Sequence, residues 1–324
     1  MTSPRPPLLL IVGPTGVGKS AIALELAGRW GGEILSADSI QVYRGMDIGS
    51  AKASAGERAR IPHHCIDLCE PDRPFSVAQY RERALRALEE ISSRGRLPIA
   101  VGGSGFYLKT FFAPTVDSLA IAPEIRHRVE KIFQDSGLPG LLRELDGLHR
   151  HPPRCLDRAN ARRVMRALER CLASGLELDA LRDRFRALPH PCAGHAIRTL
   201  LLERPSTSLR PILAERIGAM VRAGLVDEVL SLRRRNFEAN PSARCAVGYR
   251  QVLEFLDGKM ARAALEEKIF AATWSLVRRQ RTWFRHQLPI DRRMELADAW
   301  ADSGAFAAQW VRENGPALRQ LLEM

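Results

Sequence analysis

Residues 8–20 read LLLIVGPTGVGKS, and this stretch decides the fold class. Leu8 to Val12 is an apolar run with the length of one buried strand, and residues 13–18 form a glycine-rich turn. The stretch from Lys19 to Trp30 then has the spacing of an amphipathic helix. A strand, a G-x-x-x-x-G-K-[ST] loop and a helix in this order predict a phosphate-binding loop, because glycines let backbone N–H groups turn toward an anion at the positive end of the helix.

The loop indicates a phosphate-bearing ligand and a metal ion, without specifying ATP. Lys19 supplies a positive charge for the outer phosphate, and the hydroxyl of Ser20 suits Mg²⁺. A chance Lys-Ser pair in a glycine-rich turn would leave the flanking strand and helix unexplained. The residues expected to bind a diphosphate or nucleotide are Gly13, Pro14, Thr15, Gly16, Val17, Gly18, Lys19 and Ser20.

The rest of the chain predicts an α/β class with a parallel sheet. EILSA (33–37) and PIAV (98–101) are short apolar strands, and the stretch from Phe75 to Arg94 has helical spacing. From about 120 to 187 only helical patterns occur, and AIRTLLLE (196–203) is a further strand. We therefore expect residues 1–115 to form the first part of a catalytic core, 116–195 a helical insertion, and 196–324 mostly helices that complete the core.

Composition narrows the class of protein. The 324 residues carry a formal net charge of +12, which fits a polyanionic partner such as nucleic acid, although a basic surface without such a partner fits equally. No apolar run is long enough for a membrane span, and MTSPRPP (1–7) lacks the features of a signal peptide. The six dispersed cysteines predict reduced thiols and a cytoplasmic location. The sequence offers a candidate zinc site at His63, His64, Cys65 and Cys69. It shows no second pair of Cys or His ligands that would complete a tetrahedral site.

A second segment distinguishes this chain from an ordinary nucleotide hydrolase. An NTPase usually offers an apolar strand that ends in a metal-binding Asp, yet Gly102 follows the strand at 98–101. The strand-terminal acid is Asp38, in SADSIQVYRGMDIGSAK (36–52). Because ligands bind at the carboxyl edge of parallel strands, we expect Asp38 to lie close to the phosphate loop. A helix N-cap would also explain an Asp here, but not the whole segment.

Five ordered motifs resemble those of the tRNA dimethylallyltransferases, also called tRNA isopentenyltransferases. The resemblance runs from about residue 8 to about 287. The motifs are GPTGVGKS (13–20), SADSIQVYRGMDIGSAK (36–52), PHHCID (62–67), VGGSGFYL (101–108) and RRQRTWFR (278–285). It implies a P-loop NTPase-like parallel sheet with a helical insertion that clasps the anticodon stem-loop. It also implies transfer of a dimethylallyl group from dimethylallyl diphosphate to the exocyclic amine of the adenosine 3′-adjacent to the anticodon, with Mg²⁺ as cofactor and release of diphosphate.

The resemblance also implies roles for individual residues. Asp38 matches the catalytic aspartate, Arg216 the arginine that stabilises the leaving diphosphate, and Ser104 a hydroxyl that contacts the target adenosine. Without the resemblance, Arg216 would be interpreted as a solvated helix charge. The implied tRNA contacts are Asp38, Ser39, Ile40, Gln41, Ser104, Arg126, Arg162, Arg163, Arg166, Arg244, Tyr249, Arg250, Arg278, Arg279, Gln280, Trp283 and Arg285.

The segment RRQRTWFRH (278–286) independently favours RNA binding, since it interleaves cations for phosphates with planar rings for bases. An amphipathic helix with a buried aromatic face is the alternative. Three departures from the family pattern concern this RNA-facing side. They are DRAN (157–160), where Asn160 takes an acidic position, Trp274 in place of Arg, and an extra residue in RCAVGYR (244–250).

Two other functions compete with the transferase. A small-molecule or nucleotide kinase fits the loop and the α/β alternation but not the absent second acidic strand end. A non-catalytic RNA-binding protein fits the charge but leaves Asp38 beside a complete phosphate loop unexplained. We expect a monomeric enzyme with no membrane association.

Overall fold

The computed structural model describes residues 6–117, 119–153, 156–296 and 303–323, and it consists of two compact units. The first joins residues Met1–Ala113 to Pro191–Met324, and the second is Pro114–His190. The sequence predicted the insertion at 116–195, so its expected start lies two residues inside the second unit and its expected end five residues past it.

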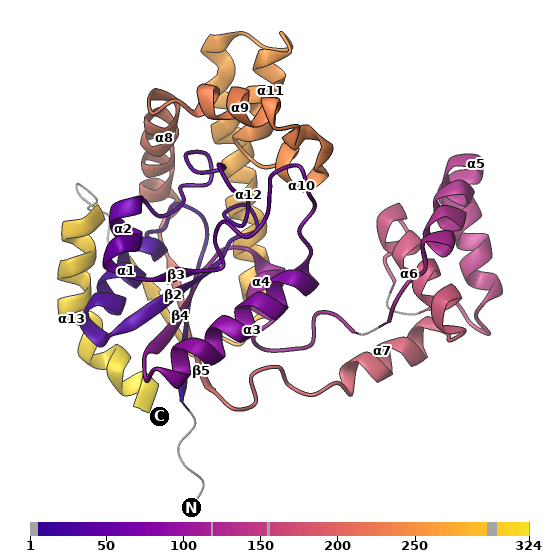
Figure 1. Cartoon of the computed structure of the whole chain (residues 1–324), viewed down its shortest axis with the longest axis horizontal. Helices are drawn as coiled ribbons and strands as arrows, with labels where there is room; N and C mark the ends of the chain where they lie inside the picture. The colour runs from indigo at the N-terminus through magenta and orange to yellow at the C-terminus, as the bar shows by residue number, and fades with distance from the viewer. Residues whose placement is uncertain (1–5, 118, 154–155, 297–302, 324) are drawn as a thin grey trace, which may run out of the picture. The chain divides into compact units, whose positions relative to one another are not determined.

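A six-stranded parallel sheet forms the centre of the first unit, in the order β3-β2-β4-β1-β5-β6 (Figure 1). Four strands were predicted from apolar runs, whereas the two edge strands were not. The edge strands are too short or too polar to give an apolar signal: β3 is HH and β6 is RRME. The strands are β1 (Pro7–Val12), β2 (Gly32–Ala37), β3 (His63–His64), β4 (Leu97–Gly102), β5 (Ala196–Glu203) and β6 (Arg292–Glu295).

The strand register aligns the carboxyl ends of the central strands. Val12 of β1 lies opposite Gly102 of β4, and Gly102 lies opposite Ala37 of β2. The chain therefore leaves these strands toward Gly13, Asp38 and Gly103 at one edge of the sheet. This geometry confirms the prediction that Asp38 lies beside the phosphate loop.

Both faces of the sheet are buried, which explains why its central strands are continuously apolar. Leu9 and Ile11 of β1 belong to a core that includes Trp310 of α13, and Leu8 and Leu10 belong to a core that includes Tyr80 of α3. Helices α1 and α13 cover one face and α3 covers the other (Figure 1). The first unit is thus a three-layer α/β/α sandwich.

Local sequence signals mark where some helices of the first unit begin. For example, Ser76 and Gln79 form a capping box at the start of α3. No helix among the described residues is both long and apolar enough to cross a bilayer. The helices are α1 (Lys19–Trp30), α2 (Ala55–Arg60), α3 (Val77–Ser93), α4 (Gly105–Lys109), α8 (Ser206–Arg222), α9 (Leu225–Arg234), α10 (Pro241–Arg244), α11 (Tyr249–Leu256), α12 (Leu265–Gln287), α13 (Ser303–Glu323) and the short 3₁₀ turns η1 (Phe237–Ala239) and η2 (Arg262–Ala264).

The second unit is helical and has its own apolar core. Its helices are α5 (Pro123–Gly147), α6 (Ala161–Ser174) and α7 (Leu178–Arg186), and Val129, Leu145 and Leu168 are fully buried among them. Helix α5 is interrupted at Gly137, which has a positive φ of 59°. Asn160 caps α6, because its side-chain oxygen accepts a hydrogen bond from the backbone N–H of Arg163. A capping role accounts for Asn at a position where the family pattern has an acid.

Candidate functional site

The phosphate loop has the backbone shape that anion binding requires. Gly16 and Gly18 have φ values of +80° and +106°, which side chains with a Cβ rarely adopt. Helix α1 begins at Lys19, so the N–H groups of its first turn have no partner within the helix. The ammonium of Lys19 donates a hydrogen bond to the carbonyl oxygen of Pro14, 2.8 Å away, and this bond holds the side chain across the loop.

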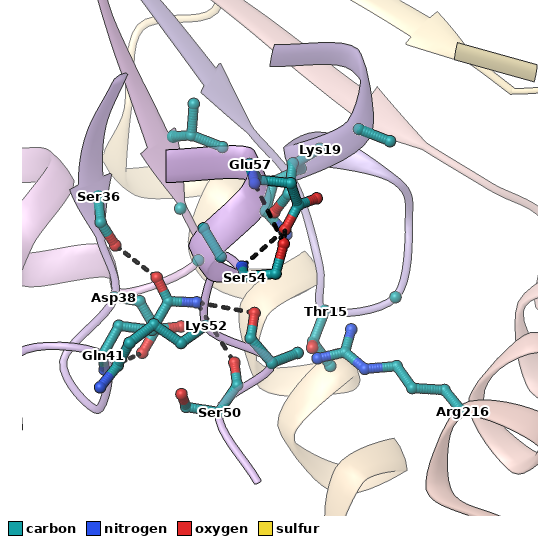
Figure 2. Close-up of a pocket in the computed structure, with 18 of the residues that line it drawn as sticks. Thr15, Lys19, Ser36, Asp38, Gln41, Ser50, Lys52, Ser54, Glu57 and Arg216 are labelled. Carbon is teal, nitrogen blue, oxygen red and sulfur yellow. Dashed lines mark hydrogen bonds between the residues drawn. The ribbon is translucent and has the colours of Figure 1, made fainter. Parts of the chain in front are cut away.

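A cavity of about 1070 Å³ lies at this edge of the sheet and is lined by the loop. Lys19 and Ser20 line it from α1, Asp38 from the end of β2, and Arg216 from α8. Figure 2 shows the guanidinium of Arg216 extending into the cavity toward the loop. The structure thus brings Asp38 and Arg216, two of the predicted catalytic residues, together with part of the predicted diphosphate-binding loop. The loop residues that line the cavity are Thr15, Gly16, Gly18, Lys19 and Ser20, whereas Gly13, Pro14, Val17 and the predicted catalytic Ser104 do not line it.

The electrostatics of the cavity favour an anion. Burial and, to a smaller extent, the nearby Arg216 lower the pKa of Lys19 to about 7, while Asp38 acts in the opposite direction. Burial also lowers the pKa of Arg216, again against the attraction of Asp38. Neither Lys19 nor Arg216 forms an ion pair with any described carboxylate. Partly desolvated cations without a paired anion are stabilised when a negatively charged ligand enters.

Asp38 is held by its own turn rather than by a cation. Its Oδ1 accepts hydrogen bonds from the backbone N–H groups of Ile40 at 2.8 Å and Gln41 at 3.4 Å. Residues 39–42 form a turn and not a helix, so the capping alternative is satisfied in part. The same carboxylate also lines the cavity, which a cap alone does not require.

Ser104 is hydrogen-bonded to Ser39, the residue that follows Asp38. Its Oγ accepts a hydrogen bond from the backbone N–H of Ser39 at 2.9 Å and donates to the hydroxyl of Ser39 at 3.2 Å. This close approach depends on Gly102, where an added Cβ would lie 2.1 Å from the carbonyl oxygen of Ala37. The glycine thus lets β4 and the loop after it pack directly on the segment that carries Asp38.

Gln280 connects the C-terminal basic motif to the phosphate loop. Its Oε1 accepts a hydrogen bond from the backbone N–H of Thr15 at 2.9 Å, and its Nε2 donates to the carbonyl oxygen of Gly103 at 3.0 Å. Trp283, one turn later on α12, packs on Gly105. The resemblance implied that both side chains contact RNA. In the structure they support the loops around the cavity, an interaction for which the sequence carried no direct signal.

The other predicted RNA contacts differ in accessibility. Tyr249 is fully buried and Gln41 hydrogen-bonds within the protein, so we do not retain either side chain as a direct RNA contact. Arginines on α10, α11 and α12 are exposed, as are four on the helical unit. The exposed residues are Arg244, Arg250, Arg278, Arg279 and Arg285, together with Arg126, Arg162, Arg163 and Arg166.

Trp274, the second departure from the family pattern, is half-buried between two arginines. The guanidinium carbon of Arg210 lies 4.9 Å from the ring centre, and that of Arg281 lies 5.7 Å from it. Arg281 is held in turn by a hydrogen bond to the carbonyl oxygen of Arg204. Trp274 therefore joins α8 to α12 through cation–π contacts.

The zinc site raised by the sequence is not formed. No cluster of three or more His, Cys, Asp or Glu side chains suited to a metal exists among the described residues. His64 instead contacts Glu33 at 2.7 Å, and the thiol of Cys65 is buried, which raises its pKa to about 12.

Comparison with known proteins identifies relatives over nearly the whole chain. Residues 41–287 match a family model described as IPP transferase, and residues 6–69 match one described as isopentenyl transferase. A tRNA dimethylallyltransferase of Opitutus terrae is 45% identical over 93% of this chain and 97% of its own length. The crystal structure of a tRNA isopentenylpyrophosphate transferase from Bacillus halodurans is 30% identical with a TM-score of 0.69, covering 98% of this chain and 97% of that one. A eukaryotic dimethylallyltransferase acting on tRNA shares the fold at 22% identity and a TM-score of 0.75, over 97% and 80% of the two chains.

Proposed function

This chain belongs to the IPP transferase family, and we propose that it transfers a dimethylallyl group from dimethylallyl diphosphate to tRNA. The acceptor is the exocyclic amine of the adenosine 3′-adjacent to the anticodon, and diphosphate is released. The observation that carries the proposal is the meeting of a phosphate loop, two half-buried cations and the Asp38 carboxylate in one cavity.

The chemistry requires stabilisation of a leaving diphosphate. As the amine nitrogen bonds to the allylic carbon, the carbon–oxygen bond to diphosphate breaks and negative charge grows on the departing oxygens. The N–H groups of the loop, Lys19 and Arg216 are already in place to meet that charge. Preorganised donors of this kind lower the barrier because they need little reorientation during the reaction.

The same reaction requires a proton acceptor. The exocyclic amine of adenosine is a weak nucleophile, and its proton must leave as the new bond forms. Asp38 accepts that proton in our proposal, because its carboxylate faces the cavity and its Oδ1 is fixed by two backbone N–H groups. Ser104 aligns the segment next to Asp38 and offers a hydroxyl to the incoming nucleoside.

The donor set suits Mg²⁺ held jointly with a diphosphate. Mg²⁺ in phosphate-loop proteins takes one or two protein ligands and completes its shell with phosphate oxygens and water. Ser20 is exposed at the cavity wall and would supply such a ligand. When bound, the ion would neutralise charge on the diphosphate oxygens.

The exposed arginines are the proposed tRNA contacts. They carry mobile positive charge for the phosphate backbone, and the net charge of +12 agrees with that partner. Those on the helical unit would bind the anticodon stem-loop. A monomeric state and a cytoplasmic location remain predictions from the sequence.

The test is a transfer assay. Purified protein is incubated with Mg²⁺, radiolabelled dimethylallyl diphosphate and unmodified tRNA with adenosine after the anticodon, and a matched tRNA carries guanosine there. We expect label in the adenosine tRNA alone. Label in neither tRNA, with phosphoryl transfer from ATP in a parallel reaction, would favour the kinase.

A further inference from the structure

The loop at 46–52 forms one wall of the cavity, yet it contains no regular secondary structure that would hold it there. Asp47, Ile48 and Ser50 all line the cavity. A segment without helix or strand bonds needs other partners for its backbone N–H groups. Where those partners lie decides whether the wall keeps its shape.

A single carboxylate on a distant helix supplies these partners. Glu228 of α9 accepts hydrogen bonds from the backbone N–H groups of Asp47 at 3.0 Å, Ile48 at 2.6 Å and Gly49 at 3.2 Å. Three successive N–H groups that converge on one anion form a concave backbone site for negative charge. Here a side chain of the same protein occupies that site.

Tyr249 completes the arrangement from a third element, α11. Its hydroxyl donates a hydrogen bond to Glu228 at 2.7 Å, and its ring packs so closely on Gly49 that an added Cβ there would lie 2.6 Å from it. Tyr249 has no exposed surface, and its burial together with Glu228 raises the pKa of the phenol well above its usual value. The tyrosine therefore stays a hydrogen-bond donor.

The loop passes this restraint on to the segment that carries Asp38. The side-chain amide of Gln41 donates to the carbonyl oxygens of Ser50 and Ala51, each at 3.3 Å, and its Oε1 accepts from the hydroxyl of Ser36 at 2.8 Å (Figure 2). The backbone N–H of Gln41 is also one of the two that bind Asp38. Hydrogen bonds and the backbone that joins them thus connect Glu228 of α9 to the carboxylate of Asp38.

We propose that Glu228 and Tyr249 are positioning residues that lock the loop at 46–52 against the donor cavity and so fix Asp38 for proton transfer. This inference rests on the proposed transferase function for its catalytic consequence, while the locking itself is independent of that function. Neither residue lines the cavity, and the pair acts through Gln41.

The test separates the loop from the chemistry by measuring both. Amide hydrogen exchange at 47–49 and steady-state transfer are compared in the wild type, Glu228→Ala, Glu228→Gln, Tyr249→Phe and the control Asp227→Asn, which removes an exposed charge on the same helix. In Glu228→Ala we expect the amides at 47–49 to exchange about tenfold faster or more, and kcat to fall by about tenfold or more. Both effects are large because hydrogen bonds to a charged group are worth more than neutral ones.

The other variants set the scale. Glu228→Gln keeps one carbonyl acceptor, so it is expected to recover part of the loss in kcat. Tyr249→Phe removes one hydrogen bond, so its kcat is expected to fall about threefold. Asp227→Asn is expected to match the wild type in both measurements. In each the affinity for tRNA stays unchanged, which a general loss of folding would not allow.

Two results would overturn the proposal. One is wild-type exchange at 47–49 in folded Glu228→Ala, which would show that the carboxylate does not hold the loop. The other is faster exchange with an unchanged kcat in a wild-type enzyme that transfers the prenyl group. If the wild type transfers nothing, the proposed function fails, and the exchange data still decide whether the lock exists.

Discussion

The cavity of the α/β unit and the helical unit differ in whether their cationic side chains have ion-pair partners. In the cavity, Lys19 and Arg216 are half-buried and neither has an ion-pair partner among the described residues. In the helical unit, several arginines are paired with carboxylates on the same unit. These pairs are Arg158 with Asp146, Arg163 with Asp157, Arg166 with Glu169 and Arg170 with Asp117. The unpaired cations of the cavity are therefore available to an anionic ligand at once, whereas a paired arginine must first leave its carboxylate partner to bind RNA.

The same two regions show which features could be predicted from the sequence. The phosphate-binding loop at 13–20 could be predicted because its backbone N–H groups do most of the binding. The spacing of its glycines indicates the backbone conformation directly. The sheet register then placed Asp38 beside it, as parallel strands ending in apolar residues predict. By contrast, the sequence could not show that Arg166 is paired with Glu169 or that Tyr249 is buried.

Three contacts lay beyond sequence reasoning for a common physical reason. Gln280 reaches Thr15 across 265 positions, and Glu228 reaches Ile48 across 180. No periodicity or local spacing encodes a hydrogen bond between such distant positions. Trp274 likewise gains its role only when α8 brings Arg210 over its ring. A family motif marked Gln280 and Tyr249 as important, but their chemistry came from the tertiary structure.

The largest expected effect concerns the carboxylate of the cavity. Asp38→Asn keeps an oxygen for the N–H of Ile40 but cannot accept a proton, so we expect kcat to fall about 10³-fold. Single-turnover transfer with saturating tRNA measures the change, and binding of dimethylallyl diphosphate serves as the control. A rate within tenfold of wild type would remove Asp38 as the base.

Arg216 should matter next, because it meets charge that develops only as diphosphate departs. Arg216→Ala is expected to lower kcat/KM for the donor about 10²-fold. The matched control is Arg222→Ala, since Arg222 is exposed on the same helix and does not line the cavity. Equal effects of the two substitutions would contradict a special role for the cation that lines the cavity.

The pH dependence of anion binding tests the unbalanced charge directly. With its pKa near 7, Lys19 loses its proton in the free protein as the pH rises above that value. The affinity for inorganic diphosphate should then fall by up to about tenfold per pH unit beyond that of Lys19→Arg, which stays charged. Titration calorimetry from pH 6 to 9 measures the difference, and parallel profiles for the two proteins would refute the lowered pKa.

The same pKa has a consequence for stability with a defined sign. The unfolded chain keeps Lys19 protonated up to its ordinary pKa of 10.5, so between about 7 and 10.5 the folded protein binds fewer protons. The contribution of Lys19 to the free energy of unfolding therefore rises with pH in that window. Chemical denaturation of wild type and Lys19→Met across the window checks the sign.

The smallest effects are expected for arginine substitutions in the helical unit. Their size should depend on whether the arginine forms an ion pair. Arg162 has no ion-pair partner among the described residues, whereas Arg166 is bound to Glu169 at 2.8 Å. We expect Arg162→Ala to weaken tRNA binding about fivefold and Arg166→Ala less than about twofold. Filter binding at two salt concentrations compares them, and the reverse order would show that self-paired arginines open to bind RNA.

The most direct measurement is the choice of ligand by the phosphate loop. Binding of dimethylallyl diphosphate and of ATP to the purified protein is measured by calorimetry with Mg²⁺, each in wild type and in Arg216→Ala. We predict that dimethylallyl diphosphate binds more tightly than ATP, and that the substitution weakens its binding. Tighter binding of ATP, followed by its hydrolysis or by phosphoryl transfer, would contradict a prenyl diphosphate site.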